Sequence, residues 1–267
     1  MTRVWTALAL ALPALAAVLW APVWLFAALT ALLALAGLLE WLELARAGGA
    51  APFAWIGGVG TVALVLLVSL PVTPQVWLAV LIALVLALGV RALCRPEGVA
   101  QHAANVSLTL FGMFYLGLFI GLLDAIRDSS AGIIWLVFLL VVVWAGDIAA
   151  LYAGRAWGRH RMAPRVSPKK TWEGAAAAFI VAVLLGAGLG AWTNVPLSHW
   201  PIVAMAALGG AINVAAQVGD LFESLLKRGA QVKDSGTIFP GHGGVLDRID
   251  ALLFAAPVLW YYVTYFH

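Results

Sequence analysis

Apolar runs of close to 20 residues follow one another along most of this chain of 267 residues. A helix needs about 20 mostly apolar residues to cross the hydrocarbon core of a membrane. Charged residues make up only 10% of the sequence, whereas an average soluble domain has about 25%. A chain this poor in charge cannot cover a surface that faces water. The sequence therefore predicts an all-α, polytopic integral membrane protein.

Nine apolar segments are candidate membrane spans. We expect them at about 4–21, 22–45, 53–70, 75–93, 104–123, 132–154, 174–192, 200–219 and 249–266. With nine spans, all of the 15 Lys and Arg residues except Arg127 fall on one side of the membrane. Because basic loops usually face the cytoplasm, the N-terminus and the polar loops 155–173 and 220–248 are predicted to be cytoplasmic.

The first 21 residues have a second interpretation, as a secretory signal peptide. Arg3 precedes an apolar core, and small residues lie around Ala14-Leu15-Ala16, which is the pattern of such a peptide. Its removal, with 22–45 retained, would place the basic loops on the wrong side of the membrane. We therefore expect the segment to be a retained span.

Polar chemistry is concentrated in the second half of the chain. We expect one membrane domain, with N-terminal helices in 1–100 and a catalytic region in 101–267. Glu40 and Glu43, near the end of the second span, are expected to reach the lipid headgroups rather than to take part in catalysis. The single cysteine, Cys94, excludes an intrachain disulfide and a cysteine-based zinc site.

Two polar elements precede the C-terminal one. Asp147 lies inside a predicted span, where a carboxylate usually faces a partner or a wet cavity; a functional role and a structural pairing with Arg155 both remain open. Residues 154–174 carry six basic side chains, which suit anionic headgroups. Ser167 and Glu173 are expected to help start the next helix. Lys169 and Lys170, with a hydroxyl beside them, are expected to bind phosphate.

The third element, residues 217–250, is the richest in ionisable groups. If the preceding span continues as a helix, Asp220, Ser224 and Lys227 lie on one face, at i, i+4 and i+7. Gly229 is placed to end that helix. Asp247 and Asp250 would lie in the first turn of the last span, where the helix dipole favours carboxylates; capping alone accounts for one of them.

Between these helices, residues 240–244 form a glycine-rich loop. Backbone amides in such a loop can bind an anion, although a tight turn is the simpler explanation of glycines alone. Basic side chains surround the loop, and nearby carboxylates suit Mg²⁺, a cation that prefers oxygen ligands. His242 is expected to contact phosphate or support the loop. The basic residues are Lys227, Arg228, Lys233 and Arg248.

Residues 224–250 resemble the signature of the phosphatidate cytidylyltransferases, also called CDP-diacylglycerol synthases. The pattern reads Ser224-x-x-Lys227-Arg228-x4-Lys233-Asp234-x-Gly236-x-x-Phe239-Pro240-Gly241-His242-Gly243-Gly244-Val245-x-Asp247-Arg248-Ile249-Asp250. We call 224–250 the signature segment. The likeness covers roughly 105–267, including Asp147, Arg155 and the stretch 167–174.

The resemblance implies an all-helical membrane dimer that joins CTP and phosphatidic acid to give CDP-diacylglycerol and pyrophosphate. It implies a divalent metal, Mg²⁺, and leaves the number of metal ions open; no nucleic-acid partner is expected. Asp220 and Asp247 would bind the metal, and with Lys227 and Asp250 they form the expected catalytic set. The expected substrate-binding residues are Ser224, Arg228, Lys233, His242, Gly243, Arg248, Ser167, Lys169 and Lys170.

Two other functions fit part of the sequence. A CTP-dependent lipid kinase would use similar phosphate chemistry but transfer the γ-phosphoryl group. A transporter would explain Asp147 and the broken helix near 229–244, but it predicts a matching interruption in 1–100, which the sequence lacks. The motif of the CDP-alcohol phosphotransferases is absent.

Overall fold

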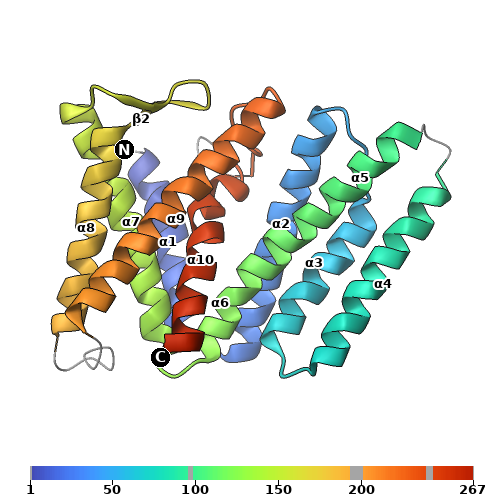
Figure 1. The fold of residues 1–267 in the computed structure, drawn as a ribbon, viewed down its shortest axis with the longest axis horizontal. Helices are drawn as coiled ribbons and strands as arrows, with labels where there is room; N and C mark the ends of the chain where they lie inside the picture. The colour runs from blue at the N-terminus through green and yellow to red at the C-terminus, as the bar shows by residue number, and fades with distance from the viewer. Residues whose placement is uncertain (1, 96–98, 193–200, 239–242, 267) are drawn as a thin grey trace. The chain divides into compact units, whose positions relative to one another are not determined.

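Helices make up nearly all of the computed structural model, which describes residues 2–95, 99–192, 201–238 and 243–266 (Figure 1). The α-helices, the π-helical segment η1 and two short strands follow one another in the order α1 Thr2–Trp20, α2 Val23–Ala47, α3 Ala54–Ser69, α4 Pro74–Leu93, α5 Val99–Gly112, η1 Met113–Leu118, α6 Phe119–Asp128, α7 Gly132–Trp157, β1 Arg161–Ala163, β2 Ser167–Thr171, α8 Trp172–Ala191, α9 Ile202–Gly229 and α10 Leu246–Phe266.

Seven of the described helices are long and apolar enough to cross a membrane, which confirms a polytopic membrane protein. One of them, Gln101–Asp128, runs without a break through α5, η1 and α6. The predicted spans 4–21 and 53–70 form α1 and α3, whose apolar helical stretches are shorter. The 16 residues of α3 extend about 24 Å along the helix axis, which is less than the hydrocarbon thickness of about 30 Å. The count of nine spans therefore remains a prediction.

The chain divides into two compact units. Unit 1 consists of Met1–Ala125 with Leu226–Arg248, and unit 2 of Ile126–Leu225 with Ile249–His267. Helices α9 and α10 each contribute residues to both units. The division that we expect from the sequence, at residue 100, is not tested by these contacts and stays a prediction.

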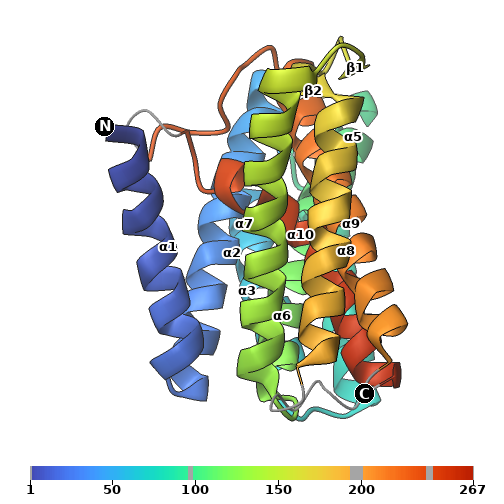
Figure 2. The same ribbon diagram turned by 90° about the vertical axis from the view of Figure 1, so that its left-hand side faces the viewer.

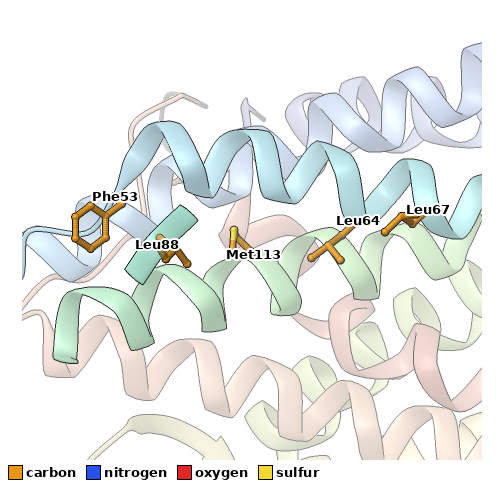
Figure 3. Close-up of a cluster of buried hydrophobic side chains, with 5 residues drawn as sticks. All are labelled: Phe53, Leu64, Leu67, Leu88 and Met113. Atoms are coloured by element: carbon orange, nitrogen blue, oxygen red, sulfur yellow. The ribbon is translucent and has the colours of Figure 1, made fainter. Parts of the chain in front are cut away.

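In unit 1, α3 packs against α2, α4 and the helix that runs through α5 and η1 (Figure 1). Figure 3 shows the apolar cluster at these contacts, to which three of the helices and the segment before α3 contribute. Its buried members are Phe53, Leu64, Leu67, Leu88 and Met113. Proline begins α4 at Pro74 and precedes α2 at Pro22, positions where its missing amide costs no helical hydrogen bond.

One buried carboxylate joins three helices of unit 1. Asp124 of α6 is 6% exposed, and the hydroxyls of Thr30 and Ser69 each lie 2.8 Å from its Oδ2. A charged group away from water needs such donors, because unpaired burial costs several kcal/mol. These bonds tie α6 to α2 and α3.

In unit 2, α7 and α8 pack side by side, and the antiparallel hairpin β1–β2 lies at their shared end (Figure 2). Thr171 is the N-cap of α8, with its hydroxyl accepting from the amide of Gly174 at 3.2 Å. The prediction that Ser167 helps to start this helix is therefore wrong, because Ser167 lies at the start of β2. Glu173 does lie in the first turn of α8, as expected.

Candidate functional site

Asp247 is the most extensively bonded of the predicted site residues in unit 1. It is the second residue of α10, and its Oδ2 accepts from the amide and hydroxyl of Ser235, at 2.8 and 2.9 Å, and from the amide of Gly244, at 2.8 Å. Its Oδ1 forms an ion pair with Lys227 of α9. The two side chains are 7% and 11% exposed. Removing either member of a buried ion pair takes a counter-charge from the other, so the two residues depend on each other.

Glycines at the end of the loop admit two carboxylates. Gly243 has φ +79°, a left-handed conformation that favours glycine, and a Cβ there would collide with the carboxylate of Asp247. A Cβ at Gly244 would collide with the carboxylate of Glu40, and one at Gly236 would lie 2.5 Å from Glu40 Oε1. Gly236, Gly243 and Gly244 therefore have a steric function here, apart from any contact with an anion.

The expectation that Glu40 reaches lipid headgroups is wrong. Glu40 is only 3% exposed, and its carboxylate accepts from Ser235 Oγ and from the amides of Val245 and Leu246, each at 2.8 Å. Glu43, one turn further along α2, is exposed as expected. Sequence reasoning missed Glu40 and Ser235, although a carboxylate in an apolar helix is itself a signal of a buried partner.

The other cationic residues predicted in unit 1 lie on its surface. Arg228, Lys233 and Arg248 are exposed, and Arg228 Nη1 donates to the carbonyl of Val232 at 3.1 Å. His242 lies outside the described residues. The amide of Gly244, part of the predicted anion-binding loop, donates to Asp247, so this donor is satisfied within the protein.

In unit 2, the structure brings Lys170 and Asp220 together. Lys170 Nζ of β2 lies 2.6 Å from Asp220 Oδ2 of α9, and the two side chains are 26% and 35% exposed. Ser224, one turn beyond Asp220, has its hydroxyl 3.5 Å from Asp220 Oδ1, so the predicted spacing does place them on one face. Helix α9 ends at Gly229, which confirms that prediction.

The remaining predicted residues of unit 2 have more varied settings. Asp250 lies in α10 and is partly buried. In β2, Ser167 is partly buried and Lys169 is exposed. Asp147 of α7 is exposed in this chain. Beside the hairpin, Glu173 pairs with His160, whose Nδ1 lies 2.6 Å from the carboxylate.

The candidate metal ligands have the donor chemistry that Mg²⁺ requires. Asp220 and Asp247 each offer carboxylate oxygens, and each has a lysine beside it, so both positions suit a positive charge. Among the described residues, no group of three or more His, Cys, Asp or Glu side chains forms a metal cluster. Mg²⁺ typically uses one or two protein carboxylates, with substrate phosphates and water completing its shell. The donor chemistry of each carboxylate therefore fits Mg²⁺.

Comparison with known proteins places this site in a family. The phosphatidate cytidylyltransferases of Brucella suis biovar 1 and Bacillus subtilis are 42% and 34% identical to this chain over 58% and 61% of its length. The aligned regions cover 56% and 60% of those proteins, so the chain spans little more than half the length of these relatives. The phosphatidate cytidylyltransferase of a Synechocystis species is 34% identical over 90% of this chain and 89% of its own.

A model of the cytidylyltransferase family matches residues 1–266. The likeness therefore extends through the first hundred residues, beyond the 105–267 that the motifs alone cover. Because the match includes nearly every residue, the chain belongs to the cytidylyltransferase family.

Proposed function

We propose that this protein is a CTP:phosphatidate cytidylyltransferase, which converts CTP and phosphatidic acid into CDP-diacylglycerol and pyrophosphate. The observation that carries the proposal is the complete signature segment, 224–250, in a chain of the cytidylyltransferase family. The buried pair of Lys227 and Asp247 within that segment supports it. So does the name shared by the relatives, one of which aligns over 90% of the chain.

The reaction needs charge neutralisation more than it needs a base. A phosphate oxygen of the lipid forms a bond to the α-phosphorus of CTP, and the bond from that phosphorus to the bridging oxygen breaks, releasing pyrophosphate with the electron pair. A phosphomonoester is largely ionised near neutral pH, because its second pKa is about 6. The main obstacle is repulsion between two anions, which lysine and arginine side chains reduce.

We assign roles to the predicted residues on this basis. Lys227 and Asp250 complete a catalytic set with the metal ligands Asp220 and Asp247. Mg²⁺, when bound, neutralises phosphate charge and stabilises the leaving pyrophosphate. The residues proposed to bind the substrates are Ser167, Lys169, Lys170, Ser224, Arg228, Lys233, His242, Gly243 and Arg248.

The proposed setting is the cytoplasmic membrane. Nine spans with a cytoplasmic N-terminus place the basic segments at the inner face, where CTP arrives from water and phosphatidic acid from the bilayer. The proposed assembly, a homodimer, rests on the resemblance to the family.

A labelled-nucleotide assay tests the function. Purified protein in detergent receives phosphatidic acid and CTP labelled at the α-phosphorus, with Mg²⁺ or with EDTA. We expect label in the lipid phase only with Mg²⁺. A parallel reaction with γ-labelled CTP and added diacylglycerol should leave the lipid unlabelled, whereas a lipid kinase would transfer the γ-phosphoryl group to the diacylglycerol hydroxyl and release CDP. No α-label in the lipid phase would refute the proposal.

A further inference from the structure

Glu40 of α2 is the first residue of a bonded chain that ends at Asp247. It comes from the N-terminal third, where the motif analysis found little polar chemistry, yet all its observed partners belong to the signature segment. Both residues lie in unit 1. The role inferred for these hydrogen bonds rests on the proposed function, because that function assigns metal binding to Asp247.

The two oxygens of Glu40 bind three donors that hold the start of α10. Oε1 accepts from the amide of Val245, and Oε2 from the amide of Leu246 and the hydroxyl of Ser235. Amides at the N-terminus of a helix lack partners within the helix. Here a carboxylate from another helix supplies the cap, and its charge also complements the helix dipole. Glu40 therefore fixes the backbone on which Asp247 stands.

Ser235 connects the two carboxylates directly. Its hydroxyl lies 2.8 Å from Glu40 Oε2 and 2.9 Å from Asp247 Oδ2, and it is also 3.3 Å from the amide of Asp247. A hydroxyl has one hydrogen to donate, so the two carboxylates share it. The hydrogen bonds from Ser235 and Gly244 fix Oδ2 of Asp247, and Oδ1 faces Lys227.

We propose that Glu40 is a positioning residue for the metal site. Through Ser235 and the start of α10 it holds Asp247 in one orientation, with Oδ1 directed toward Lys227. Its negative charge, one hydroxyl away, also strengthens the attraction of Asp247 for a cation. Partners of a metal ligand typically contribute about 10- to 100-fold to metal affinity or activity.

The test compares two glutamates of the same helix. Glu40→Gln removes a charge and puts an amide NH₂ where three donors converge; Glu43→Gln makes the same chemical change at an exposed position. Binding of Mn²⁺, a paramagnetic stand-in for Mg²⁺, is measured by electron paramagnetic resonance on purified protein in detergent. The Mg²⁺ concentration for half-maximal cytidylyl transfer and the Tm are measured in parallel.

We expect Glu40→Gln to weaken Mn²⁺ binding and raise the Mg²⁺ half-saturation by about 10- to 100-fold, with a smaller loss of kcat at saturating Mg²⁺. Glu40→Asp, which keeps the charge on a shorter side chain, should recover part of the affinity. Glu43→Gln should match the wild type. A merely structural Glu40 would lower Tm and kcat without changing either metal constant, and that outcome overturns the inference.

A second variant covers the case in which Glu40→Gln does not fold. Ser235→Ala removes the shared hydroxyl and keeps the bonds of Glu40 to Val245 and Leu246, so we expect a shift of the same sign. Unchanged Mn²⁺ affinity in Ser235→Ala would overturn the proposal. Mn²⁺ binding also distinguishes failure of the proposed function from failure of the role inferred for Glu40. If the wild type forms no CDP-lipid, the proposed function is refuted, and the Mn²⁺ titrations still show whether Glu40 affects metal binding.

Discussion

Lys170 and Asp220 form an ion pair, Nζ to Oδ2 at 2.6 Å, that joins strand β2 to helix α9. The two residues belong to separate polar elements of the sequence. Because both are partly exposed, the pair adds little to stability, typically 0–1 kcal/mol. Because breaking this ion pair costs little stability, the lysine and the carboxylate suit a position that binds phosphate and metal.

The first prediction concerns Lys170. Lys170→Gln should raise the KM for CTP or phosphatidic acid about 10- to 100-fold, because a hydrogen bond to a charged group contributes roughly 1.5–3 kcal/mol. Steady-state kinetics in detergent micelles measure the change. Arg165→Gln, an equal loss of charge at an exposed position in the hairpin turn, is the control, and an equal effect there would indicate general attraction to lipid instead.

The second prediction concerns Asp220. Asp220→Asn should reduce Mg²⁺-dependent turnover at least 100-fold, of the order seen when a group that stabilises transition-state charge is removed. Its Tm should change little, because the side chain is 35% exposed. Activity and tryptophan-fluorescence melting are measured on the same preparation. Retention of most of the activity would remove Asp220 from the metal site.

The third prediction concerns the buried pair. Asp247→Asn should abolish turnover and also lower the Tm, because Lys227 loses a counter-charge at a buried position. The double variant Lys227→Met with Asp247→Asn should be more stable than Asp247→Asn alone, while remaining inactive. Additive losses of unfolding free energy in the double variant would contradict the coupling.

The fourth prediction concerns Gly244. Gly244→Ala should destabilise the protein by about 1–3 kcal/mol and reduce activity, because the added methyl group overlaps the carboxylate of Glu40. Gly229→Ala is the control, since a Cβ at that helix end meets no atom within 4 Å. Thermal melting of the two variants decides between a steric effect and a general intolerance of alanine.

The fifth prediction concerns topology. Cys94 is the only cysteine and is exposed, and nine spans place it on the cytoplasmic side. A membrane-impermeant maleimide should label it in inverted vesicles and leave it unlabelled in intact spheroplasts. In a Cys94→Ser background, Ser130→Cys should give the opposite result. Labelling of both sites from one side would refute the nine-span arrangement.

The sequence predicts local features of this protein well and long-range ones poorly. Helices appear where apolar length demands them, and Gly229 ends α9 as its position suggests. The hairpin of β1 and β2 was not predicted, because a short strand in a basic loop shows no apolar alternation. Glu40 was misassigned because its partner Ser235 is 195 positions away, and nothing in the neighbourhood of either residue indicates the other.

The bond between α2 and the start of α10 also constrains how the protein is made. Glu40 leaves the ribosome long before Ser235 and Leu246, so an unfinished chain carries a carboxylate in an apolar helix with none of the donors that later surround it. Only residues about 195 to 206 positions further along the chain relieve that cost. Insertion of α10 and formation of a competent site thus become a single event, and a chain terminated before α10 should be a ready substrate for membrane proteases.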